Sequence, residues 1–385
     1  MTKEVWTIKR CLDWTRDYLR DKGDERPRLS AEWLLSGVTG LTRTEIYMSF
    51  EKPLSADELS RMHGAVVRRA KGEPLQYIVG ETSFRMIDVA CEPGVLIPRP
   101  ETELLVEEVL QFLDREVLGA PVCRGRVELP WNDEVEAARR AEEAKRAEDG
   151  ADDAKAAPSA DVMADGQHDG SEDDAMDAGA LGAGVVADSE TDEGLDEDVS
   201  DEARVARVLE VGCGTGCISL SIAREREGRV ACVATDIEPR AVALAARNRD
   251  KLGIETAWVD IRQGNLVSPL DRETEWGTFD VLVSNPPYIP SDVMGALPHE
   301  VVAFEPALAL DGGTDGLDVF RRLVKAAPHM LRPGGLLACE LFEGHLDQAA
   351  ALCREAGMWD VQVKDDLTQR PRMLLARVGG IEPTV

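Results

Sequence analysis

The sequence predicts an α/β protein: a doubly wound, mostly parallel, seven-stranded sheet that follows a small all-helical N-terminal domain. Seven short apolar runs lead to this prediction, because buried parallel strands read as near-continuous hydrophobic segments. Helical patterns separate most of the first five runs, which indicates a Rossmann-like sheet of strands joined by helices. The last two runs follow a helix expected at 344–357 and predict an antiparallel edge. The runs are 205–211, 230–236, 258–262, 279–284, 336–340, 359–363 and 372–377.

The length and composition bound the class of protein. A chain of 385 residues is long enough for two or three domains with a full core. No run of about 18 apolar residues occurs, and the first residues, MTKEVWTIKRCLDW, are too polar for a signal peptide. We therefore expect a soluble cytoplasmic protein without a membrane partner. The eight cysteines include no C-x-x-C pair, which favours reduced, mostly buried thiols over a disulfide framework or a metal site.

The net charge of −29 is unevenly distributed along the chain. Residues 131–204 contain 25 Asp and Glu against 6 Lys and Arg, which leaves a net charge of −10 for the rest. A protein that binds duplex nucleic acid usually presents a basic face, so the charge argues against direct nucleic-acid binding without excluding it. The segment 124–204 is rich in Ala, Asp, Glu and Gly. It cannot bury enough apolar surface to offset its ordering entropy, and we expect a disordered insertion.

The first 72 residues predict a small domain of three to five helices. Ser30 precedes a helical spacing of apolar residues, and Thr42 and Ser55 each precede a glutamate by three residues. These last two patterns are capping boxes, which open helices. No cluster of titratable residues occurs in this segment, so we assign it no chemistry.

A hairpin-like connector is expected between the helical domain and the sheet. It would consist of a strand at 84–90, a turn at 92–94 and a second strand at 95–97, followed by a helix that begins near Pro98. The expected divisions of the chain are 1–72, 73–98, 99–123 together with 205–385, and the insertion 124–204.

A glycine-rich loop after the first predicted strand indicates a cofactor site. Such a loop lets the backbone approach a ligand, and the N-terminus of the helix that follows favours an anionic group such as a carboxylate. Twenty residues after the loop, Asp236 ends the second strand, where it can accept both hydroxyls of a ribose. Asn265 and Leu266 fall where an adenine should lie. The loop residues are Gly212, Cys213, Gly214, Thr215 and Gly216.

The tetrapeptide Asn285, Pro286, Pro287 and Tyr288 ends the fourth predicted strand and indicates a substrate site. Each proline lacks an N–H and disfavours the helical region for the residue before it, so the segment is extended with outward-facing carbonyls. The Asn285 side-chain oxygen and the Pro286 carbonyl can accept the two hydrogens of a substrate –NH2 group, with Tyr288 stacked beside a planar target. NAD and S-adenosylmethionine both fit the cofactor residues, but the tetrapeptide Asn285 to Tyr288, called the clamp below, favours N-methylation. The alternative is a proline-rich turn without a chemical role.

Together these motifs resemble the class I S-adenosylmethionine-dependent methyltransferases, and more closely the release factor glutamine methyltransferases (the PrmC/HemK family). The resemblance covers about 73–124 and 205–378 and, more weakly, 1–72. Further motifs that carry it are IPRPETE at 97–103, FEP at 304–306, ALDGG at 309–313 and DGL at 315–317.

The resemblance implies transfer of a methyl group from S-adenosylmethionine to N5 of the glutamine in the Gly-Gly-Gln motif of peptide chain release factors. By position it places Gly212 to Gly216 at the methionine moiety, Asp236 at the ribose, and Asn265 with Leu266 at the adenine. It implies that Asn285 to Tyr288 hold the substrate amide and that the helical domain helps to bind the factor. Relatives often have an acid at the position of Asn265 and an aromatic residue at that of Leu266, and they lack the acidic insertion. We expect a monomer without a metal ion.

Other functions stay open at this point. A methyltransferase acting on the exocyclic amino group of adenine in DNA or RNA shares the Asn-Pro-Pro-Tyr logic, with the base flipped out of its stack. A ribosomal-protein glutamine is another possible substrate. The chain could also be a non-catalytic binder of release factors, although the intact loop and clamp argue against that.

Overall fold

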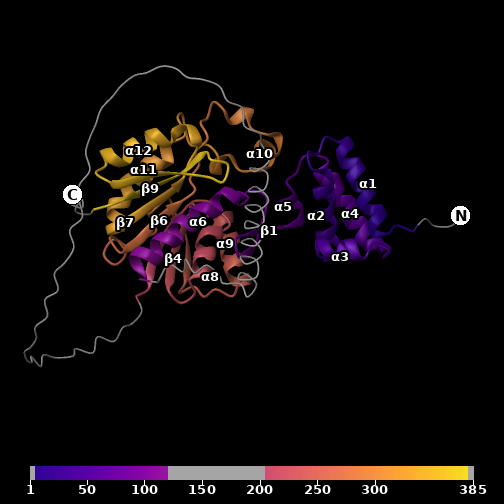
Figure 1. Cartoon of the computed structure of the whole chain (residues 1–385), viewed down its shortest axis with the longest axis horizontal. Coiled ribbons are helices and arrows are strands. Elements are labelled where there is room, and N and C mark those ends of the chain that lie inside the picture. The colour runs from indigo at the N-terminus through magenta and orange to yellow at the C-terminus, as the bar shows by residue number, and fades with distance from the viewer. Residues whose placement is uncertain (1–4, 120–203, 380–385) are drawn as a thin grey trace, which may run out of the picture. The chain divides into compact units, whose positions relative to one another are not determined.

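The computed structural model describes residues 5–119 and 204–379, so the acidic insertion expected at 124–204 lies almost entirely outside the described residues. No helix in the described ranges has the length and apolar character needed to cross a membrane. Figure 1 labels the elements along the chain. The elements before the insertion are α1 (Ile8–Asp21), α2 (Pro27–Thr39), α3 (Arg43–Met48), α4 (Ala56–Arg69), α5 (Leu75–Val79), β1 (Glu81–Phe84), β2 (Ile87–Ala90) and α6 (Pro100–Phe112), which continues as a π-helical turn, Leu113–Val117.

After the insertion the chain alternates strands and helices until its antiparallel end. The elements are β3 (Ala206–Val211), α8 (Cys217–Glu225), β4 (Val230–Asp236), α9 (Pro239–Lys251), β5 (Val259–Gln263), β6 (Phe279–Ser284), α10 (His299–Phe304), α11 (Asp318–Met330), β7 (Leu331–Glu340), α12 (Leu346–Glu355), β8 (Trp359–Asp365) and β9 (Pro371–Arg377), with 3-10 turns at Met294–Ala296, Ala307–Ala309 and Glu343–His345.

The helical domain is built by α1 to α4, which share one apolar core. The expected capping boxes are confirmed: the Thr42 and Ser55 side chains accept hydrogen bonds from the backbone N–H groups three residues later. The expected helix start at Ser30 is wrong, because α2 begins at Pro27 and Ser30 is buried inside it. A proline fits the first turn of a helix, where its missing N–H has no partner to lose.

The connector forms a hairpin, but not the one expected. β1 and β2 pair antiparallel with Phe84 opposite Ile87, so the turn is Arg85–Met86 and the residues from Val95 to Ile97 form no strand. Arg85 has a φ of 49°, a conformation that usually requires glycine, so the sequence carried no turn signal here. Its guanidinium is held in place by Glu225, with Nε–Oε1 and Nη2–Oε2 distances of 2.6 and 2.8 Å.

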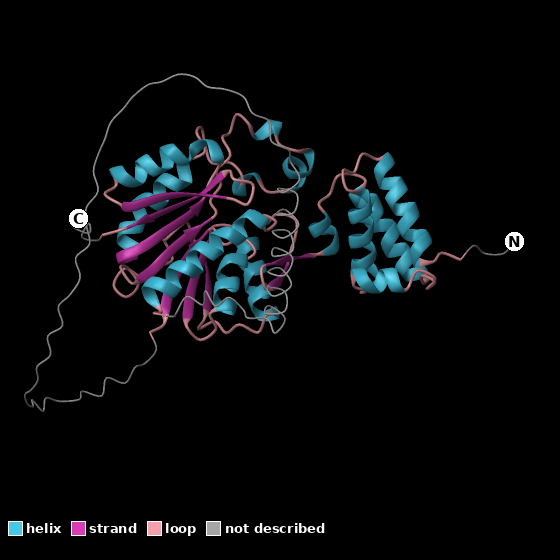
Figure 2. Ribbon diagram, viewed as in Figure 1, coloured by secondary structure: helices cyan, strands magenta, loops and turns pink. Residues whose placement is uncertain are grey.

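The predicted doubly wound sheet is confirmed, with the strand order β5-β4-β3-β6-β7-β9-β8. The five strands from β3 to β7 are parallel, and β9 and β8 form the antiparallel edge. Figure 2 shows the strands as a twisted sheet with helices against it. The chain leaves β3 first toward β4 and β5 and then returns to place β6 on the other side of β3. This reversal is a topological switch point, where ligands bind at the carboxyl ends of the strands.

Two apolar cores cover the two faces of the sheet. Alternate residues of a strand face opposite sides, so Val208 belongs to the core under α6 and α8, whereas Leu209 belongs to the core under α11 and α12. The strands predicted at 230–236 and 279–284 match β4 and β6 residue for residue. β7 begins five residues before its predicted start at Leu336.

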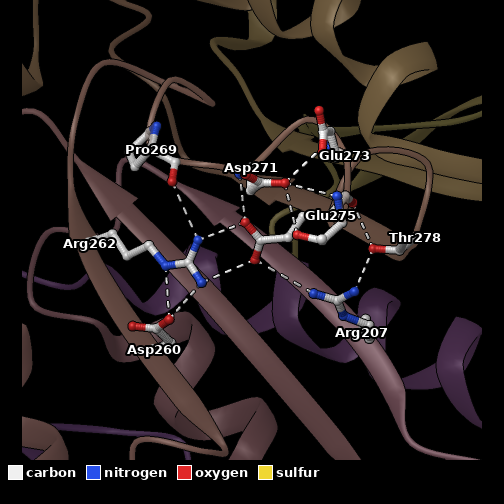
Figure 3. Close-up of polar contacts among 9 residues, drawn as sticks. Arg207, Asp260, Arg262, Pro269, Asp271, Glu273, Glu275 and Thr278 are labelled. Carbon is white, nitrogen blue, oxygen red and sulfur yellow. Dashed lines mark hydrogen bonds and ion pairs between the residues drawn. The ribbon is translucent and has the colours of Figure 1, made fainter.

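A cluster of ion pairs centred on Glu275 holds the segment between β5 and β6, as Figure 3 shows. Arg262 of β5 donates from Nη1 and Nη2 to the two Glu275 carboxylate oxygens at 2.8 and 3.0 Å. The Glu275 carboxylate also accepts from the Asp271 backbone N–H at 2.8 Å, and Arg207 of β3 lies 3.8 Å away. The side chain of Glu275 is only 12% exposed, so these contacts are shielded from water. The cluster therefore anchors the segment that begins with Asn265 and Leu266.

We predict that Glu275→Gln lowers the free energy of unfolding at pH 7 by about 1–2 kcal/mol. The substitution removes the charge that pairs with both ends of the Arg262 guanidinium, although Arg262 keeps its contact with the Asp260 carboxylate at 2.7 Å. Arg262 lowers the pKa of Glu275, so this stabilisation exists above the unfolded-state pKa and is lost as pH falls through the folded-state value. The difference between variant and parent should thus shrink below about pH 4 in urea titrations. Glu273→Gln, in the same segment but exposed, is the matched control and should change little. An equal loss from both variants would contradict the assignment.

Candidate cofactor and substrate site

A cavity of about 260 Å³ opens at the carboxyl ends of β3, β4 and β6, at the switch point of the sheet. It brings together ten of the twelve residues predicted for the site, and Gly216 and Tyr288 are not among those that line it. The ten are Gly212, Cys213, Gly214, Thr215, Asp236, Asn265, Leu266, Asn285, Pro286 and Pro287.

The glycine-rich loop forms one wall of the cavity. The backbone N–H groups of Gly212 and Cys213 both donate to the Thr235 carbonyl, at 2.8 and 3.0 Å, which fixes the loop against the end of β4. Gly212 has a φ of 76°, and no atom lies within 4 Å of the position that a Cβ would occupy. Its backbone is therefore accessible to a ligand in the cavity. Gly216 has a different function: a Cβ there would lie 3.1 Å from the Cβ of Ala245, so this glycine permits close packing against α9.

Asp236 lies at the end of β4, where its carboxylate holds the loop. Oδ2 accepts from the Gly214 N–H at 2.8 Å, and Oδ1 accepts from the Glu238 N–H at 2.9 Å. Burial raises the pKa of Asp236, while these two backbone hydrogen bonds oppose the rise. Each carboxylate oxygen can accept a second hydrogen bond, so the acceptors expected for a ribose are still available.

Asn265 and Leu266 line the cavity beyond β5. Asn265 Oδ1 accepts from Arg322 Nη2 at 2.8 Å, which leaves its amide hydrogens free to donate. Leu266 has a φ of 53°, and its carbonyl accepts from the Thr235 hydroxyl at 2.8 Å, which helps to hold that unusual conformation. Ile237, which also lines the cavity, is 49% exposed. Leu266 and Ile237 thus give the cavity two apolar side chains beside its polar ones.

The clamp residues follow β6 directly. The Ser284 hydroxyl donates to the Val211 carbonyl of the neighbouring strand at 2.6 Å, which fixes the strand end just before Asn285. Beyond the clamp, Ile289 exchanges backbone hydrogen bonds of 2.9 and 2.8 Å with Leu310 and Gly312. The clamp is therefore tethered on both sides. Among the described residues, no backbone N–H donates to the Pro286 carbonyl.

The Asn285 amide is held from behind. Its Nδ2 donates to the Thr102 hydroxyl at 3.0 Å, and that hydroxyl donates to Glu340 Oε2 at 2.6 Å. Tyr288, expected to stack beside a planar substrate, donates its hydroxyl to Glu340 Oε1 at 3.3 Å. Its stacking stays a prediction. Burial raises the pKa of Glu340, against the hydrogen bonds from Thr102 and Tyr288 and the charge of Arg372.

An ion pair with a buried carboxylate joins two of the family-like motifs beside the cavity. Arg99 of the IPRPETE motif pairs with Glu305 of the FEP motif, and Glu305 Oε2 also accepts from the Ile97 N–H at 3.4 Å. The side chain of Glu305 is 1% exposed. Residues on both sides of this pair, Pro98 and Pro306 among them, line the cavity.

Comparisons with known proteins find full-length relatives of this chain. A release factor glutamine methyltransferase of Geobacter sulfurreducens is 35% identical, and the alignment covers 98% of this chain and 98% of that protein. The chain belongs to the release factor glutamine methyltransferase family. The proteins of the same name from Moorella thermoacetica and Chlorobaculum tepidum are 32% and 30% identical over 96% and 97% of this chain, and over 98% and 97% of their own lengths.

Models of two protein families also match parts of the chain. The model described as PrmC N-terminal domain matches residues 10–80, and the model described as Methyltransferase small domain matches residues 182–313. The first match covers most of α1 and all of α2 to α5, and the second contains the glycine loop and the clamp. The resemblance expected for the N-terminal helical domain and the one expected for the methyltransferase domain are thus each supported by a separate family model.

Glu210 lines the cavity, although the sequence reasoning assigned it no function. Its Oε2 accepts from the Ser219 N–H at 2.9 Å, whereas its Oε1 is buried without a hydrogen-bond partner in the described part of the chain. Burial raises the pKa of Glu210 to about 7, and the nearby charge of Asp236 adds to the rise. An unpartnered carboxylate oxygen at a cavity wall is suited to a cationic group of a ligand.

Glu210, Ile237 and Thr102 are among the lining residues to which the sequence reasoning assigned no function. Glu210 begins the quoted glycine motif, and Ile237 is an apolar residue directly after the expected ribose acid, so both had a local signal. Thr102 had only its place in the IPRPETE motif. No group of His, Cys, Asp and Glu in the described ranges has the arrangement of a metal site. The seven cysteines in those ranges are free thiols and buried.

We predict that Glu210→Gln stabilises the protein by about 2–4 kcal/mol at pH 8 and by about 1 kcal/mol or less at pH 5. The folded-state pKa of Glu210 is raised above the unfolded-state value. The parent protein therefore has its full free energy of unfolding below the unfolded-state pKa, where Glu210 is protonated in both states, and loses part of it as pH rises through about 7. Glutamine keeps the shape of the protonated acid at every pH. Urea unfolding at both pH values measures the effect.

The exposed acid Glu227, replaced by glutamine, is the control and should behave like the parent at both pH values. A Glu210→Gln effect of the same size at pH 5 and pH 8 would show that Glu210 does not titrate between them.

Proposed function

We propose that this protein transfers a methyl group from S-adenosylmethionine to the side-chain amide nitrogen of a glutamine in a peptide chain release factor. The observation that carries the proposal is the clamp: the Asn285 amide, fixed from behind, and the Pro286 carbonyl lie in the wall of the same cavity as the glycine loop. Two acceptors next to a cofactor loop are what the methylation of an –NH2 group requires. Membership of the release factor glutamine methyltransferase family supports the choice of substrate.

The residues of the cavity fit S-adenosylmethionine, which when bound supplies an electrophilic methyl group. The free Glu210 oxygen suits the ammonium group of the methionine moiety, and the N-terminus of α8 suits its carboxylate. Asp236 has lone pairs left for the ribose hydroxyls, and the Asn265 amide hydrogens can donate to an adenine ring nitrogen. Ile237 and Leu266 provide apolar surface for that ring.

The chain positions the substrate amide rather than deprotonating it first. Asn285 Oδ1 and the Pro286 carbonyl each accept one amide hydrogen, which draws charge onto the nitrogen and directs its lone pair into the cavity. An amide nitrogen becomes acidic only as the methyl group is added, so solvent can take the proton afterwards. None of the histidines in the described ranges lines the cavity, which agrees with a reaction without a histidine base.

The proposal includes the finer features that the sequence suggested. The glutamine is that of the Gly-Gly-Gln motif, the helical domain 1–72 contributes to binding the release factor, and the enzyme works as a monomer in the cytoplasm. Exposed apolar residues lie near the clamp in sequence, with Val302 at 48% and Leu308 at 57% exposure. Leu308 also lines the cavity, so it suits contact with the loop that presents the glutamine.

Mass spectrometry of a release factor incubated with the protein and S-adenosylmethionine tests this function directly. The expected result is a single added methyl group on the glutamine of the Gly-Gly-Gln peptide. A release factor in which that glutamine is replaced by asparagine is the matched control and should stay unmodified. Methylation of adenine in DNA or RNA, with no methylation of the release factor, would contradict the proposal.

We predict that Asn285→Ala lowers the single-turnover rate of methyl transfer about 100-fold or more, while the affinity for S-adenosylmethionine changes little. The amide oxygen positions the substrate nitrogen, and that contribution matters most in the transition state. Rapid-quench assays at saturating cofactor give the rate, and calorimetry gives the affinity. A rate near that of the parent would mean that the tetrapeptide is only a turn.

A further inference from the structure

A chain of hydrogen bonds runs from the clamp into the protein interior. Asn285 Nδ2 donates to Thr102 Oγ1 at 3.0 Å, and Thr102 Oγ1 donates to Glu340 Oε2 at 2.6 Å. The three residues come from the segment after β6, the first turn of α6 and the last residue of β7. Thr102 is 2% exposed and Glu340 is 1% exposed, so water cannot replace these contacts.

The end of this chain sets its direction. Burial raises the pKa of Glu340, whereas the hydroxyls of Thr102 and Tyr288 and the charge of Arg372 favour its ionised form. In that form the carboxylate has no proton to donate and accepts from both hydroxyls. A threonine hydroxyl has a single proton, so once Thr102 donates to Glu340 it can only accept from Asn285. The NH2 end of the amide must then face Thr102, and its oxygen must face the other way. A flipped amide would place two oxygens 3.0 Å apart with no proton between them.

The orientation matters because the two ends of an asparagine amide have nearly the same shape but opposite hydrogen-bonding character. Asn285 lines the cavity, and no described residue donates a hydrogen bond to its Oδ1. With the oxygen toward the cavity, Asn285 accepts from an –NH2 group. With the amide flipped, it would present donors to donors and repel the same substrate.

We propose that Thr102 and Glu340 are positioning residues that hold the Asn285 oxygen toward the substrate nitrogen. This inference rests on the proposed function, because it assigns the two residues to the methylation of an –NH2 group. The Thr102 hydroxyl contacts the Asn285 amide, and the Glu340 carboxylate contacts the Thr102 hydroxyl, so neither group needs to touch the reacting atoms. Each acts through Asn285.

The same hydrogen bonds could serve only to hold α6 against the sheet, without orienting the Asn285 amide. A double-mutant cycle distinguishes this structural role from the positioning role. Thr102→Val removes the acceptor at nearly constant shape and should lower the single-turnover rate on a release factor at least tenfold in the parent. In the Asn285→Ala background it should cause no further loss, because the amide it orients is gone. Thr102→Ser keeps the hydroxyl and should restore most of the rate. Calorimetry should give the same S-adenosylmethionine affinity, within about threefold, for every variant.

Equal rate losses in both backgrounds, or a Thr102→Ser variant as slow as Thr102→Val, would overturn the proposal. Should Thr102→Val fail to fold, Glu340→Gln replaces it in the same cycle. Glutamine can present either an oxygen or an NH2 to Thr102, so both amide orientations become possible and a partial loss of rate is expected, again only in the presence of Asn285.

Neutron diffraction from crystals of the perdeuterated parent protein tests the orientation without any assay of activity. The expected map shows two deuterons on the side of the Asn285 amide that faces Thr102, and deuterons facing the cavity would refute the inference. If the parent does not methylate a release factor but the map shows the expected orientation, the proposed function fails and the oriented acceptor stands. If methylation occurs with the opposite orientation, only the inference fails.

Discussion

The parallel pairing of β3 with β6 is the constraint on which the site depends. Glu210 pairs with Val283, so the two strands end level with each other and the residues that follow them, Gly212 and Asn285, open into one cavity. The Ser284 hydroxyl bonded to the Val211 carbonyl holds the strand ends together just before the chains diverge. A slip of one residue would turn the alternating side chains of β6 to the opposite face. The packing of both cores therefore fixes the distance between the cofactor loop and the substrate clamp.

Two buried acids have different functions in this site: Glu210 lines the cavity, and Glu340 lies behind the clamp. Glu210 keeps one oxygen without a partner, which lowers stability at neutral pH and leaves an acceptor for a ligand. Glu340 has both oxygens occupied, by Thr102 and Tyr288, and stabilises an orientation instead. An unsatisfied buried group is costly and is kept where a function requires it, whereas a satisfied one specifies a unique arrangement.

The sequence was sufficient for the fold and for the glycine loop, Asp236 and the clamp in the cavity wall, because these depend on local signals. Strands buried on both faces appear as apolar runs, and the loop and the clamp directly follow two of them. The hairpin was misplaced because its turn contains Arg85 at a positive φ and no glycine, so a strand was expected over 84–90. An ion pair with Glu225, 140 residues away, holds that turn. The contacts behind the clamp were not predictable for a similar reason, since Thr102 and Glu340 are 238 residues apart.

These distant contacts explain why motifs outside the cofactor loop matter to the chemistry. The IPRPETE segment lies near the clamp only in the folded chain, where Thr102 supports Asn285 and Arg99 pairs with Glu305 of the FEP motif. The FEP motif in turn continues into Leu310 and Gly312, whose backbone bonds to Ile289 tether the clamp from its far side. Side chains from α6 and β7 thus support the clamp, and the backbone of the loop before α11 tethers the residue that follows it. Because an acceptor misplaced by about 1 Å can cost two orders of magnitude in rate, such support from several elements is part of the active geometry itself.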